Sequence, residues 1–276
     1  MARRALFVLL AGVLCATTSA GEEPGAERPA DKPDLNGIWQ VLNRANDGLE
    51  AHPAKASYAL REGPHGPLPA EEVVALGAIG AVPAGLGVVV GGEIPYHDEA
   101  LKKRAENRAN WLSRDPEIKC YLPGIPRATY MPYPFQILHN QDAIFFTYEY
   151  AGAVRHIHLE DPGPAPLDSW MGQSTGTWDG ETLVIETTGQ NDQTWLDRSG
   201  NFHSAALRVV ERFTKTGANT LRYEATLEDP KVFTRPWTIR MTLYRHVEPG
   251  AKLMQFNCVE FVEELLYGHL RRRPLE

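Results

Sequence analysis

The segment TWDGETLVIET (residues 177–187) carries the strongest local fold signal in this sequence. Asp179 and Gly180 stand between two runs that are rich in aromatic and β-branched residues. An Asp-Gly dipeptide in this position favours a two-residue hairpin turn between antiparallel strands. We therefore predict a β-hairpin here.

Short runs of the same kind extend from residue 135 to residue 260, and turn-forming segments separate them. After a first strand in DLNGIWQVL (34–42), the predicted strands are 135–140, 143–150, 153–159, 173–178, 182–188, 205–215, 219–228, 236–247 and 252–260. So many strands with almost no helix predict an all-β fold, an antiparallel barrel of roughly 8–10 strands with a lipocalin-like character.

Alternation of apolar and polar residues predicts which face of each strand is buried. Apolar residues at every second position of 221–227 and 237–243 oppose polar ones, which is typical of strands with one dry and one wet face. In 207–213 the apolar face also contains Glu211. A buried carboxylate is costly unless it is paired, so we expect Glu211 to have a buried partner, with arginine the favoured type.

The N-terminal region differs from the strand-rich part. Residues 1–20 combine a basic start, an apolar stretch and small residues before a cleavage site, which predicts a signal peptide and an exported, periplasmic or secreted protein. Residues 21–34 have the composition of a disordered lead-in. We predict one barrel domain over 35–276. Within it, an irregular segment over 43–134 would wrap the barrel and contain one short polar helix at about 97–111.

The net charge and the signal peptide indicate which classes of partner are expected. The formal net charge of −7 argues against nucleic acid. The signal peptide is too short for an anchor, so we expect no membrane insertion. The oligomeric state stays open.

After cleavage, Cys120 and Cys258 remain, and in an oxidising compartment such a pair is a candidate disulfide, with two free thiols as the alternative.

Several blocks of the sequence resemble a known family. NGIW (36–39) is similar to the G-x-W of the first strand of lipocalin-like (calycin) barrels. Larger blocks are similar to the signature blocks of a large family of exported bacterial proteins with no assigned activity. These blocks are DPEIKCYLPGIPRATYMPYPFQI (115–137), the segment 169–204, ALRVVERF (206–213) and DPKVFTRPW (229–237). The resemblance implies export and a β fold but no reaction.

The segment VRHIHLED (154–161) places His156 and His158 two residues apart. In a strand their side chains would share one face. Three interpretations stay open: a metal site, a solvent-facing pair, or a polar cavity wall. Zinc would need a third ligand, which His203, His139 or a carboxylate could supply.

The loop over 189–204 is long for a strand connection and carries many polar and aromatic side chains, which is typical of lids and binding loops. Asp197 could orient His203, a minimal acid–base unit, or pair with Arg198. A purely structural loop is the alternative. The predicted catalytic residues are His203, Asp197, His156 and His158, and the predicted ligand-binding residues are Trp195, Asn191, Arg198, Tyr133 and Trp170.

These observations lead to three competing functions. The first is a barrel that binds a small, partly apolar molecule in its cavity, with His/Asp acid–base chemistry of lyase, isomerase or hydrolase type as an extension. The second is a passive carrier with the same cavity. The third is a metal-binding protein that uses His156 and His158, and it is the one case in which a cofactor, a metal ion, is expected. The expected partner in the first two is a small molecule.

Overall fold

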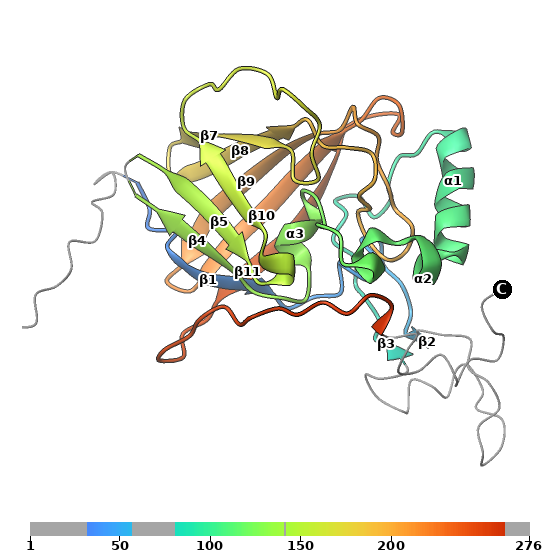
Figure 1. Cartoon of the computed structure of the whole chain (residues 1–276), viewed down its shortest axis with the longest axis horizontal. Coiled ribbons are helices and arrows are strands. Elements are labelled where there is room, and N and C mark those ends of the chain that lie inside the picture. Colours follow the sequence, from blue (N-terminus) through green and yellow to red (C-terminus); the bar gives the residue numbers. More distant parts are fainter. Residues whose placement is uncertain (1–31, 57–80, 141, 263–276) are drawn as a thin grey trace, which may run out of the picture.

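Strands dominate the computed structural model, which describes residues 32–56, 81–140 and 142–262 (Figure 1). In this part of the chain nine strands close into a barrel in the order β1-β11-β10-β9-β8-β7-β6-β5-β4. Their bounds are β1 (Gly37–Val41), β4 (Phe135–His139), β5 (Ile144–Tyr148), β6 (Val154–His158), β7 (Gln173–Asp179), β8 (Thr182–Thr188), β9 (Arg208–Gly217), β10 (Thr220–Glu228) and β11 (Trp237–Arg245). The predicted all-β barrel is confirmed.

The hairpin predicted from TWDGETLVIET is present as β7 and β8. Asp179 pairs with Thr182, and Gly180 turns the chain with a φ of +60°. One strand pair differs from the antiparallel prediction, because β6 and β7 run parallel and pair only at Ile157–Ser174 and His158–Thr175. Residues 159–172, which we call the arch, cross over between these two strands and rise at the top of Figure 1. A long crossover permits parallel pairing, whereas a hairpin does not.

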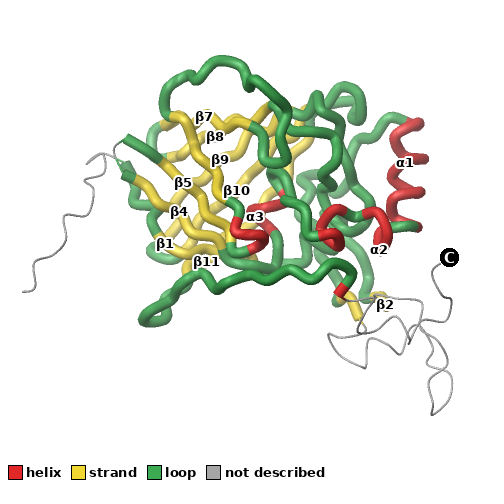
Figure 2. The backbone as a smooth tube through the Cα atoms, viewed as in Figure 1, coloured by secondary structure: helices red, strands yellow, loops and turns green. Residues whose placement is uncertain are grey.

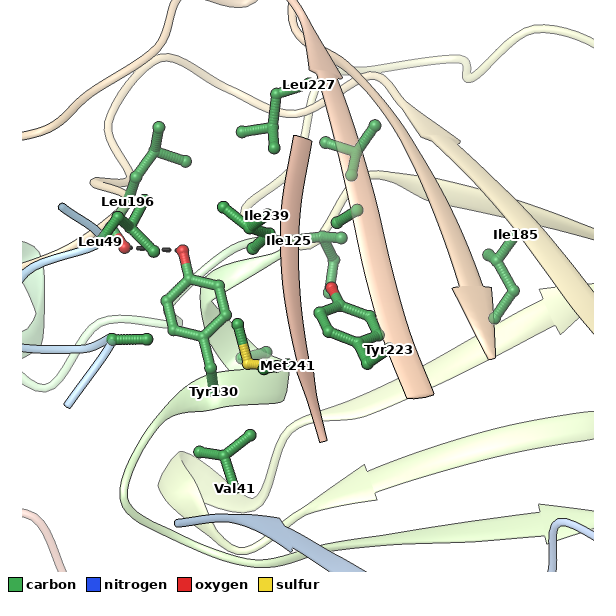
Figure 3. Close-up of a cluster of buried hydrophobic side chains, with 14 of the residues drawn as sticks. Val41, Leu49, Ile125, Tyr130, Ile185, Leu196, Tyr223, Leu227, Ile239 and Met241 are labelled. Atoms are coloured by element: carbon green, nitrogen blue, oxygen red, sulfur yellow. Dashed lines mark hydrogen bonds between the residues drawn. The ribbon is translucent and has the colours of Figure 1, made fainter. Parts of the chain in front are cut away.

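Large apolar side chains point inward from every barrel strand and fill the interior. The predicted alternation is confirmed, since Leu221, Tyr223, Ala225 and Leu227 of β10 are fully buried. Figure 3 shows Tyr223, Ile185 and Ile239 in this cluster, together with Tyr130, whose hydroxyl donates to the Leu196 carbonyl at 2.7 Å. A barrel of this size is just wide enough for side chains to fill it.

The strand predicted over 252–260 does not form. Both parts of the edge of β11 that it could join are taken: β1 pairs with residues 243–245, and residues 88–90 pair with 238–240. With no free edge available, residues 252–262 instead run along the outside of the barrel, as the red chain at the bottom of Figure 1 shows. We call residues 252–262 the strap.

Several short elements connect β1 to β4. They are β2 (Lys55–Ala56), β3 (Ala81–Val82), α1 (Asp98–Ala109), α2 (Trp111–Arg114), the 3-10 helix η2 (Pro116–Lys119) and α3 (Arg127–Tyr130). Of these, α1, α2, β2 and β3 lie beside the barrel, as Figure 2 shows, and α3 packs against β1. The predicted polar helix corresponds to α1 and α2. The proline-rich segment 120–134 contains the short helix α3 directly after a cis Ile125–Pro126 bond.

A disulfide joins Cys120 to Cys258 across 138 residues, with a Cα–Cα distance of 5.8 Å, which confirms the predicted pairing. The predicted signal peptide and nearly all of the predicted lead-in lie outside the described residues. Within the described ranges, no helix has the length and apolar character needed to cross a membrane.

Candidate functional site

His156 and His158 lie on the outer face of β6. Ile157, between them, is fully buried in the barrel core, and Arg155 also points inward. Since successive side chains of a strand alternate, both imidazoles must point away from the interior. The rings lie side by side, with 4.3 Å between their centroids.

A pocket of about 260 Å³ opens where the imidazoles meet the arch. On one side stand Val154, His156 and His158. On the other side the chain of the arch contributes mainly apolar side chains, and Arg155 and Ser174 lie between. The arch contributes Ala165, Pro166, Leu167, Ser169, Met171 and Gly172, and β7 contributes Gln173. The pocket forms at this place because β6 and β7 pair at only two positions.

Neighbouring groups hold the ring of His156 in place. Its imidazole stacks on the Phe145 ring at 4.7 Å, with 14° between the planes. Partial burial and the neighbouring imidazole of His158 lower the pKa of His156, because both disfavour the protonated ring. His156 is therefore a mostly neutral, oriented imidazole near neutral pH.

The arch is pinned to the barrel beside this pocket. The Gln173 amide donates to the Gly163 carbonyl at 2.6 Å. Gln173 also lines a second hollow of about 440 Å³ on the outer face of β7, β8 and β9, which contains Thr175, Thr177 and Glu186. The arch thus covers two adjoining hollows. Of these two, the hollow of about 260 Å³ contains the histidines.

The predicted Asp197–His203 pair does not form. Asp197 is fully buried, and its carboxylate accepts from the backbone amides of Leu49, Ser199 and Asn201 at 2.8–3.2 Å and from the Asn201 side chain at 2.6 Å. It does not pair with Arg198 either, which binds Glu117. The carboxylate instead ties the tip of the 189–204 loop to the segment around Leu49, so its contacts support the structural alternative.

His203 is buried and held on both ring nitrogens. Nδ1 lies 2.9 Å from the Ser204 carbonyl, which can only accept, so Nδ1 carries the proton. Nε2 then accepts from the Thr194 hydroxyl at 2.5 Å. Burial lowers the pKa of His203 and keeps it neutral. Neither His203 nor Asp197 lines the histidine pocket.

The structure separates the predicted ligand-binding residues. Trp195 is buried in the core, Trp170 stacks on Tyr121 at 4.9 Å, and the Asn191 side chain accepts from the Gln193 amide. Arg198 and Tyr133 come together at a smaller pocket of about 180 Å³ beneath the strap, where Phe256 contacts the Tyr133 ring at 5.0 Å.

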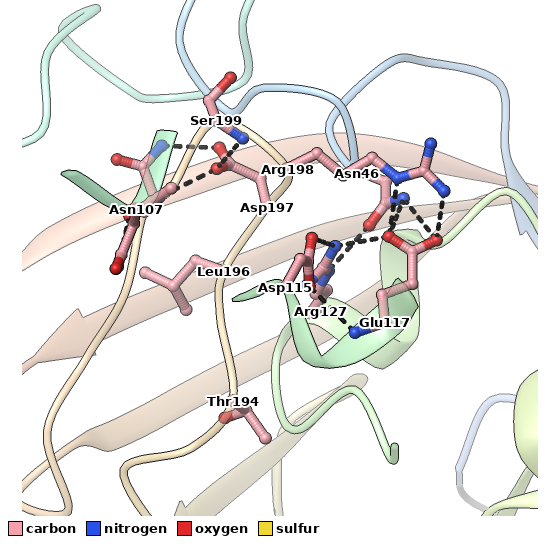
Figure 4. Close-up of polar contacts among 12 residues, drawn as sticks. Asn46, Asn107, Asp115, Glu117, Arg127, Thr194, Leu196, Asp197, Arg198 and Ser199 are labelled. Carbon is pink, nitrogen blue, oxygen red and sulfur yellow. Dashed lines mark hydrogen bonds and ion pairs between the residues drawn. The ribbon is translucent and has the colours of Figure 1, made fainter. Parts of the chain in front are cut away.

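A buried charge cluster at this smaller pocket was not predicted from the sequence (Figure 4). Arg127 binds both carboxylate oxygens of Asp115 at 2.8 and 2.9 Å and reaches Glu117 at 2.6 Å. Arg198 also binds Glu117 through two nitrogens, at 2.8 and 2.9 Å, and Arg127 donates to Asn46. Two cations thus balance two anions. A signal existed, because Arg127 is the one Asp, Glu, Lys or Arg residue between Lys119 and Asp142.

Opposing influences act on the pKa of Glu117. Burial alone would raise it, but the Arg198 and Arg127 guanidiniums outweigh burial and lower the pKa to about 2. The carboxylate is therefore ionised and already holds its partners, which makes this cluster a structural tie between η2, α3 and the 189–204 loop.

The metal interpretation of the histidine pair lacks the third ligand that it required. Among the described residues, no three His, Cys, Asp or Glu side chains form a group that could hold a metal ion. His203 is buried in hydrogen bonds elsewhere, and His139 points inward beside Trp178, with 5.4 Å between the ring centroids.

No family model matches this sequence, and neither a curated protein nor a solved structure matches it. The resemblance to exported bacterial proteins stays a prediction.

Proposed function

We propose that the protein binds a small, partly apolar molecule in the pocket between β6 and the arch. The observation that carries this proposal is the pairing of two oriented imidazoles with an apolar wall across a hollow of about 260 Å³. Such a combination, apolar lining with a few convergent polar groups, is typical of small-molecule sites. The site lies on the outside of the barrel, since side chains fill the interior.

Binding is supported better than turnover. The acid–base unit expected from Asp197 and His203 is replaced by structural hydrogen bonds, and neither residue lines the pocket. His156 and His158 are then recognition groups, which hydrogen-bond the polar end of the ligand. Pro166, Leu167 and Met171 cover its apolar end.

The test is a titration of ¹⁵N- and methionine-methyl-labelled protein with benzyl alcohol, a neutral probe that has both an apolar and a polar end. We expect saturable NMR shift changes at His156, His158 and Met171. The double variant His156→Ala/His158→Ala should weaken the binding by about tenfold, because two hydrogen-bonding partners of about 0.5–1.5 kcal/mol each are lost.

His246→Ala is the matched control, since this histidine follows β11 and does not line the pocket. The affinity of the His246→Ala variant for benzyl alcohol should equal that of the unmodified protein. Shift changes that are absent, or that centre on residues away from the arch and β6, contradict the proposal.

We also propose that the protein is exported. The predicted signal peptide and the Cys120–Cys258 disulfide both support this, because structural disulfides persist in oxidising compartments. Membership of the family of exported bacterial proteins is proposed on the sequence blocks alone.

A further inference from the structure

We infer that the ligand of the histidine pocket is a small organic acid, a carboxylate carried on an apolar ring or short chain. This inference rests on the proposed function, because it names the chemical class that the same pocket takes. The observations that carry it are the sign of the lining charges, the free donors at the pocket and the shape of its apolar wall.

The charges that line the pocket have one sign. Its lining residues include Arg155, His156 and His158 but no aspartate or glutamate, although the whole chain has a net charge of −7. Glu211 inside the barrel already neutralises Arg155. No lining carboxylate offsets the imidazoles, so a cationic ligand would find no counter-ion among the lining residues.

Hydrogen-bond donors face the same space. Within the described part of the chain, neither imidazole has a hydrogen bond or an ion pair to another side chain. The Ser169 oxygen accepts from the Gly172 amide at 3.0 Å, which leaves its hydroxyl proton available. A carboxylate accepts several hydrogen bonds at once, so it matches a set of converging donors better than an alcohol or an amide does.

Because the two imidazoles lie close together, the affinity for a carboxylate ligand should depend on pH. With 4.3 Å between ring centroids, two protonated rings repel each other, and this repulsion helps to keep His156 neutral. A carboxylate between them attracts both charges and opposes the repulsion. Binding should therefore take up protons, and affinity should rise as the pH falls from about 8 to about 6.

The remainder of the pocket suits an apolar body of limited size. Pro166, Leu167 and Met171 supply the wall opposite the imidazoles. The volume of about 260 Å³ lies below the ~300 Å³ at which sites for drug-sized ligands begin. A single ring or a short chain fits this space.

The experiment compares three probes of nearly the same shape, benzoate, benzamide and benzamidine, which are anionic, neutral and cationic. Each is titrated into the full mature protein at about pH 6 and about pH 8, with NMR shifts of His156, His158 and Met171 as the readout. We expect benzoate to bind at least about tenfold more tightly than benzamide at the lower pH. Its affinity should fall by about tenfold at the higher pH, and benzamidine should not bind.

The variant His156→Gln/His158→Gln keeps polar side chains but cannot be protonated. It should lose the pH dependence for benzoate, whereas His246→Gln, outside the pocket, should keep it. If benzamide or benzamidine perturbs the same residues with an affinity equal to that of benzoate, the acid assignment is overturned and the binding site stands. If none of the three probes perturbs these residues, both proposals are overturned.

Discussion

Arg155 and Glu211 meet inside the barrel, where either charge alone would be very unfavourable. Both side chains are almost fully buried and form an ion pair. Tyr223 donates to Glu211 at 2.8 Å, and Arg155 donates to Ser174 at 2.8 Å and to Thr187 at 2.6 Å. The arginine partner expected for Glu211 from the sequence is thus confirmed. Its position directly before His156, on the same strand as the histidine pair, was not foreseen.

Removing one member of this pair should be more damaging than removing both. Glu211→Leu leaves the Arg155 charge buried without its partner, and we expect a loss of ~3–5 kcal/mol in the free energy of unfolding. Arg155→Met/Glu211→Leu should recover most of this loss, because no charge is left buried. Urea denaturation of the two single variants and the double variant measures the coupling. Additive losses would contradict the pairing.

His203 should make the fold sensitive to mild acid. Burial lowers its pKa in the folded state, whereas the unfolded chain titrates near the ordinary value of about 6.5. Below that pH the unfolded state binds a proton at His203 that the folded state does not bind. The free energy of unfolding therefore falls as the pH drops, by up to ~1.4 kcal/mol per pH unit.

His203→Gln should flatten this dependence between about pH 7 and pH 5, whatever its effect on stability at pH 7. The free energy of unfolding measured against pH for both proteins gives the two slopes. Equal slopes would show that His203 does not titrate on unfolding.

At the scale of elements, β6 shows what a strand pattern can and cannot predict. The period of two places His156 and His158 on one face, and the structure agrees. The pattern alone does not say which face is inward, because Val154 and Arg155 each break the expected alternation. Val154 is exposed and Arg155 is buried. The direction is decided by partners distant in sequence, above all Glu211, which lies 56 residues away.

The strap is held by covalent and aromatic contacts in place of strand pairing. Phe256 packs between Tyr133 and Tyr150, with centroid distances of 5.0 and 4.9 Å, and Cys258 is bound to Cys120. The sequence correctly predicts the disulfide from the even cysteine pair. It predicts a strand wrongly, because the local pattern does not reveal that the edge of β11 is already taken.

Removal of the disulfide should destabilise the whole protein. In the chain-entropy model, a loop of 138 residues contributes on the order of 4–5 kcal/mol. We expect Cys120→Ser/Cys258→Ser to lose an amount of this order in the free energy of unfolding by urea. Reductant should weaken the unmodified protein by a similar amount and leave the serine variant unchanged. Loss in the serine variant of less than ~0.5 kcal/mol would contradict this role.

For the whole molecule, local patterns predict the barrel well and the site poorly. Hairpins such as β7–β8 follow from neighbouring residues, and strand alternation determines what is buried. The parallel pairing of β6 and β7 depends on how the barrel closes, and the pocket depends on this pairing. The 189–204 loop was expected to be a binding loop for its polar side chains. Instead, Asp197 accepts from the Leu49 backbone amide, and His203 donates to the Ser204 backbone carbonyl.

The Cys120–Cys258 bond also has a consequence for resistance to proteolysis. The covalent ring it closes contains every barrel strand except β1, and it contains the arch. The arch is exposed at several positions, including Leu167, and exposed loops are preferred sites of proteolytic cutting. A single cut there leaves a nicked molecule whose two pieces remain covalently joined, so the barrel strands cannot diffuse apart. A cut in the arch can therefore damage the pocket while the barrel stays assembled.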